Sequence, residues 1–70
     1  MNTKAKTTVA QDTELGLVAE SMKFCSYAIE NEIDAKSIDS NLLYSVATKL
    51  EQDLALVLRV AAQLEVKERA

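Results

Sequence analysis

The chain has 70 residues, 49% of them hydrophobic, with no proline, no histidine, one glycine and one cysteine. A chain of this length forms one domain at most and buries only about 60% of its unfolded surface. Because Cys25 is the only cysteine and histidine is absent, an intramolecular disulfide and a Cys/His zinc site are both excluded. Oligomerisation is therefore the expected source of additional stability.

Eleven acidic and eight basic residues give a formal net charge of −3. This charge is too small for an acidic tail and has the wrong sign for a phosphate-binding surface. The polar stretch MNTKAKTTVAQ is not followed by the apolar segment of a secretory signal, and no apolar run reaches the about 20 residues of a membrane span. We therefore expect a cytoplasmic protein without a membrane partner.

The first predicted element is a helix over about 13–32, preceded by a flexible segment over 1–12. Its apolar residues recur at steps of three and four and share one side of a helix: Leu15, Val18, Ala19, Met22, Cys25, Ile29 and Ile33. Asp12 or Thr13 is a candidate N-cap, while Thr8 and Gln11 form an alternative capping box that begins the helix earlier. A second apolar side, about 160° away, carries Leu17, Phe24 and Ala28.

The stretch NEIDAKSIDSN, residues 31–41, gathers Asn, Asp and Ser and predicts the helix break, with Asp39 or Ser40 as the next N-cap. A second helix is expected over about 40–67, with a three-heptad apolar seam of Leu43, Ala47, Leu50, Leu54, Val57, Ala61 and Leu64. A charge at Leu50 in this seam is expected to unfold the chain. The short connection makes the helices antiparallel, so residues 13–70 form one all-α helical hairpin.

The run LALVLRVAAQL, residues 54–64, has more apolar residues than one neighbouring helix covers. The apolar face of the second helix spans nearly half its circumference, which favours two neighbours and a homodimeric four-helix bundle. The alternative is a monomer in which the N-terminus or the 31–41 segment folds back over Phe24. The candidate interface with a second copy or another protein comprises Leu17, Phe24, Ala28, Asp53, Leu56, Leu58, Arg59, Val60 and Val66.

Two charged residues of this set have local explanations as well. Asp53 lies at the rim of the wide apolar face, where it either pairs with Lys49 or meets a basic group of a partner. Arg59 either covers apolar surface with its long stem or anchors an interface.

Residues suited to catalysis or metal binding are few. Cys25 lies between Met22 and Ile29 on an apolar side, without a cation that would activate it. The acidic residues Glu30, Glu32, Asp34 and Asp39 lack the spacing and glycine of a calcium loop, and Glu51 and Asp53 point in different directions. We therefore expect no enzyme and no cofactor.

The leftover apolar surface favours a protein-binding module, such as an inhibitor, adaptor or regulator, that docks a helix face on a partner protein. The size and mild acidity resemble those of small phage-encoded inhibitors of host defence or regulatory proteins. The alternatives are RNA or DNA binding by a hairpin dimer, similar in outline to plasmid RNA-binding bundles, and acidic mimicry of nucleic acid. The scattered basic residues and the low net charge argue against both alternatives.

Overall fold

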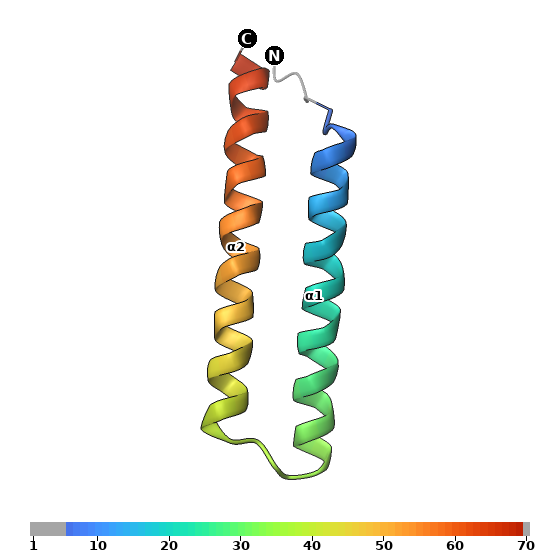
Figure 1. The fold of residues 1–70 in the computed structure, drawn as a ribbon, viewed down its shortest axis with the longest axis vertical. Coiled ribbons are helices and arrows are strands. Elements are labelled where there is room, and N and C mark those ends of the chain that lie inside the picture. Colours follow the sequence, from blue (N-terminus) through green and yellow to red (C-terminus); the bar gives the residue numbers. More distant parts are fainter. Residues whose placement is uncertain (1–5, 70) are drawn as a thin grey trace.

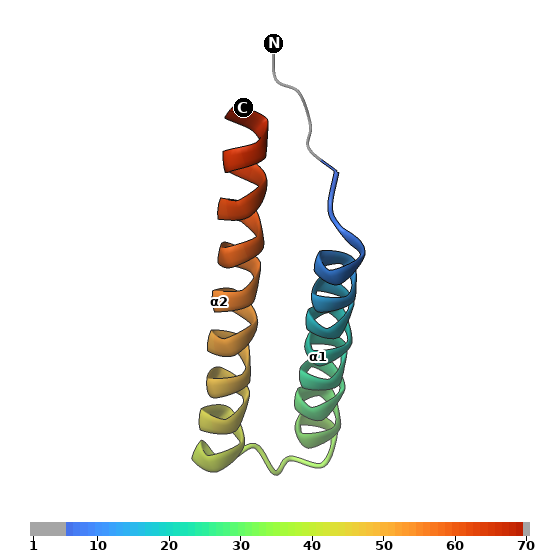
Figure 2. The same ribbon diagram turned by 45° about the horizontal axis from the view of Figure 1, so that its top comes forward.

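The computed structural model describes residues 6–69, which form two antiparallel helices side by side (Figure 1). Helix α1 spans Val9–Asp34 and helix α2 spans Ser40–Arg69, and no strand occurs within the described range. The predicted all-α hairpin is confirmed. With extents of 51 × 22 × 17 Å, the hairpin is an elongated rod in which each helix has one neighbour (Figure 2). No helix within residues 6–69 has the length and apolar character that crossing a membrane requires.

The first turn of α1 is fixed by the capping box of Thr8 and Gln11. The Gln11 amide donates to the Thr8 hydroxyl at 3.1 Å, and the Thr8 amide donates to the Gln11 side chain at 2.9 Å. The expected start at about residue 13 is therefore wrong, because this reciprocal pair satisfies two amides that a later start leaves unbonded. Residues 9–12 belong to the helix, and residues 1–5 of the expected flexible segment lie outside the described part.

The connection between the helices uses one left-handed residue and one side-chain cap. Lys36 has φ 57°, and its amide donates to the Ile33 carbonyl at 3.1 Å as α1 ends. Asp39 accepts a hydrogen bond from the Leu42 amide at 2.8 Å and caps α2, as predicted. The short, capped connection brings α2 back along α1.

The interior of the hairpin is narrow and consists of small side chains. The apolar residues buried between the helices are Val18 and Cys25 from α1, and Val46 and Val60 from α2. Val60 is 2% exposed and is the most completely buried of them. An interior of this size leaves most of the large apolar side chains outside it.

The orientation of α2 differs from the sequence prediction. The expected seam residues Leu43, Leu50, Leu54 and Val57 are all at least 40% exposed, whereas Val46 and Val60, which lie outside the expected seam, are buried against α1. The heptad stripe marks the centre of a wide apolar face, and α1 occupies only one edge of that face. The expected place of Leu50 inside the packed seam is therefore wrong, because Leu50 keeps 42% of its surface in solvent, and the unfolding expected from a charge there loses its structural reason.

Candidate interaction surfaces

Three polar contacts join the helices and set their relative position. Gln11 donates to Gln63 at 2.7 Å, and Ser21 donates to Asp53 at 2.8 Å. Near the end of the hairpin opposite the connection, Arg59 donates to Glu14 at 2.8 Å. A slip of either helix by one turn would break all three contacts, so they specify a single register.

Several predicted interface residues are buried, half-buried or hydrogen-bonded within the hairpin itself. Val60 is buried against α1 and has no free surface for another protein, so its assignment to an outer interface is wrong. Leu56, expected at an outer interface, is half-buried, because α2 is rotated relative to the expectation. Asp53 accepts from Ser21, and no ion pair with Lys49 forms among residues 6–69.

One broad side of the hairpin, which we call the leucine face, carries an apolar groove between the two helices. Val18, Met22, Leu50, Asp53, Leu54 and Val57 line the groove, which has a volume of about 200 Å³. Leu43, seven residues before Leu50, extends the same line along α2. Met22 is 53% and Leu54 57% exposed, so large side chains on this face lack a neighbour within the described chain.

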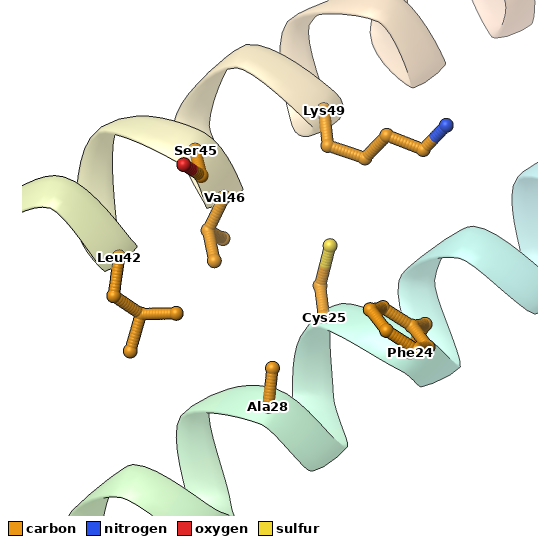
Figure 3. A pocket seen from close by; sticks show the side chains of 7 residues that line it. All are labelled: Phe24, Cys25, Ala28, Leu42, Ser45, Val46 and Lys49. Carbon is orange, nitrogen blue, oxygen red and sulfur yellow. The ribbon is translucent and has the colours of Figure 1, made fainter.

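The opposite broad side, which we call the Phe24 face, carries a second hollow. Its volume is about 270 Å³, and its lining is Phe24, Cys25, Ala28, Leu42, Ser45, Val46 and Lys49. In Figure 3 the Cys25 thiol points from α1 toward α2, and Phe24 and Lys49 flank one end of the hollow. Phe24 is 74% exposed, so nothing in the described range folds back over it.

The other predicted interface residues lie on the outside of the hairpin. Leu17 is 66% exposed and lies seven residues before Phe24, two turns earlier on the same side of α1. Leu58 and Val66 are exposed on α2, and neither lines one of the two hollows. The Arg59 guanidinium pairs with Glu14 and remains half-exposed, so this ion pair adds little to stability.

Among the described residues 6–69, the structure brings together no group of side chains suited to metal binding. No cluster of three or more Cys, Asp or Glu side chains that could hold a metal ion occurs within residues 6–69. The acidic residues near the connection act in local contacts instead, with Glu32 accepting from Ser37 and Asp39 capping α2. Cys25 is buried between the helices.

Sequence reasoning missed Gln11 and Gln63 as contacts between the helices, since neither lies in an apolar pattern. It also missed the hollow beside Phe24, because Leu42 and Ser45 lie outside the strongest heptad stripe. Comparison with protein-family models, with curated proteins and with solved structures finds no match to this chain.

Proposed function

We propose that the chain is a non-enzymatic, cytoplasmic protein-binding module that acts as a homodimer. The observation that supports this most is the presence of exposed apolar surface on two opposite broad sides of one hairpin. Exposed apolar patches of this kind mark interaction sites in small proteins. One side suffices for self-association, which leaves the other side for a partner protein.

We assign the leucine face to a second copy of the chain. The broad side of the hairpin measures 51 by 22 Å. A copy that covers most of this side would bury on the order of 1,000 Å² per chain. Stable protein interfaces bury roughly 800 Å² on each partner. The leucine face is thus large enough for a stable dimer, and two hairpins packed through it form a four-helix bundle.

We assign the Phe24 face to a partner protein that presents an amphipathic helix. The hollow between Phe24 and Leu42 accepts a large apolar side chain, because apolar groups provide nearly all of its lining. Lys49 lies at its edge and has no ion-pair partner among residues 6–69, so it favours a carboxylate beside the inserted side chain. The expected partner segment therefore combines a bulky apolar residue with an acidic neighbour.

The charge distribution supports a protein partner over nucleic acid. Arg59 pairs with Glu14, Arg69 with Glu65 and Lys23 with Glu20, so three of the basic side chains have acidic neighbours. A nucleic-acid surface needs basic groups gathered on one face and available to phosphates. The ion pairs reduce that availability.

The self-association is tested by the solution mass, measured by light scattering on a sizing column over a range of concentrations. We expect a mass near twice 7.7 kDa. A mass that remains at 7.7 kDa over the whole range would refute the homodimer.

The partner site is tested by affinity capture from a bacterial lysate with the wild-type chain, Phe24→Glu and Tyr27→Glu. Tyr27 is an exposed aromatic residue on the same helix that lines neither hollow, so it is a matched control. We expect wild type and Tyr27→Glu to enrich the same protein, and Phe24→Glu to lose it. Enrichment that Phe24→Glu leaves unchanged, or no enrichment by the wild type, would refute the assignment.

A further inference from the structure

We propose that the second copy binds the leucine face through a twofold axis perpendicular to the helices, at the level of Met22. In this arrangement α1 lies antiparallel to α1 of the second copy, α2 lies antiparallel to α2, and the two connections lie at opposite ends of the bundle. The inference rests on the proposed homodimer and specifies its symmetry.

Three apolar residues on one side of α1, Leu15, Met22 and Ile29, are arranged symmetrically about Met22. Leu15 lies seven residues before Met22 and Ile29 seven residues after it, so helical spacing places both on the Met22 side of α1, where both are half-buried. In a twofold interface, residue i contacts residue j of the copy and j contacts i. An axis at Met22 therefore pairs Leu15 with Ile29 of the copy, and Met22 with itself.

The part of the α2 heptad stripe from Leu43 to Ala61 has the same property about position 52. Leu50 and Leu54 lie two residues on either side of this centre, Ala47 and Val57 five residues, and Leu43 and Ala61 nine residues. A twofold axis at this centre pairs Leu50 with Leu54 of the copy. The two outer pairs, Ala47 with Val57 and Leu43 with Ala61, each combine an alanine with a larger side chain, as interdigitated packing requires.

The two centres lie at the same level of the hairpin. The residue numbers of the hydrogen-bonded pairs Gln11–Gln63 and Ser21–Asp53 add to the same value, which places Met22 level with position 52 of α2. One axis can therefore relate both helices to their copies at once. Two unrelated centres would allow α1 or α2 to pair with its copy, but not both.

The chemistry of the face also suits an interface that meets its own copy. The leucine-face stripe of α2 is apolar from Leu43 to Ala61, and the acidic group within the groove, Asp53, already accepts a hydrogen bond from Ser21. Depletion of charge at the centre is typical of protein interfaces. At this axis Asp53 and its copy lie at nearly the same level, and each carboxylate keeps its hydrogen bond from Ser21 of its own chain.

The symmetry is tested by disulfide crosslinking in a Cys25→Ala background, which leaves only the introduced thiol. A disulfide needs Cα atoms within about 7 Å of each other. The proposed axis places residue 22 opposite its own copy, whereas residue 15 lies about 21 Å along the bundle from its copy at 1.5 Å per residue. We therefore expect Met22→Cys to form a covalent dimer under mild oxidation, and Leu15→Cys to form none. The double variant Leu15→Cys/Ile29→Cys is expected to crosslink again.

The control for association is light scattering of each reduced variant, so that a lost crosslink is not mistaken for a lost dimer. Dimeric variants that crosslink equally at residues 15 and 22 would overturn the perpendicular axis and indicate parallel copies, while the homodimer itself would stand. Dimeric variants that crosslink at neither position would also overturn the perpendicular axis. A monomeric Cys25→Ala background and a monomeric wild type would refute both the symmetry and the homodimer.

Discussion

Leu54→Ala gives the most direct measure of how much the leucine face contributes to association. Truncation removes three carbons, worth about 0.8 kcal/mol each when fully buried. Because 57% of the residue is exposed in the hairpin, roughly 1.4 kcal/mol per copy is left for a partner to gain. The substitution occurs twice in a dimer, so the loss is about 2.7 kcal/mol, and the dissociation constant should rise about 100-fold.

The assay is sedimentation equilibrium of the wild type, Leu54→Ala and Leu17→Ala. Leu17 has a similar exposure of 66% but lies toward the Phe24 face, so the same truncation there should leave the dissociation constant within about twofold. An equal effect of the two substitutions would show that the leucine face is not the dimer interface. An unchanged constant for Leu54→Ala would show the same.

Three further substitutions test the hairpin itself. Leu50→Asp should dissociate the dimer, as measured by light scattering. It should retain more helix by circular dichroism than Val60→Asp, because Leu50 is 42% and Val60 2% exposed. An equal loss of helix in the two variants would contradict this. Val60→Ala should lower the free energy of unfolding by about 2 kcal/mol in urea titrations, whereas the exposed Val66→Ala should change it by no more than about 0.5 kcal/mol; similar values would refute the buried position of Val60. Lys36→Gly should raise the free energy of unfolding by about 0.5–1 kcal/mol, because glycine adopts φ 57° without a Cβ clash; a loss of stability would contradict this.

The helices and their caps could be predicted from the sequence because the signals are local. The Asn, Asp and Ser cluster located the break, and Asp39 caps α2 as expected. The sequence also contains the capping box of Thr8 and Gln11, and a helix start near residue 13 leaves out its two reciprocal hydrogen bonds. Local chemistry thus fixed the ends of both helices to within a few residues.

The orientation of α2 could not be predicted, because periodicity identifies the middle of an apolar face and not the edge that a neighbour occupies. The face from Val46 to Leu54 is wide enough for α1 to pack at more than one position. The position at which α1 packs on this face depends on contacts between residues distant in sequence, such as Ser21 with Asp53. No spacing within either helix indicates such a pair.

In the proposed dimer, the small interior of each hairpin makes the folded state depend on the amount of this protein in a cell. Val18, Cys25, Val46 and Val60 alone give a small interior, while the larger leucines become covered in the proposed dimer. Folding and pairing of the chains are then linked by mass action, so dilution lowers the stability of each hairpin. Scarce chains would be removed by proteases, while abundant chains would persist as pairs. Expression level would therefore set a threshold below which the Phe24 face is not presented.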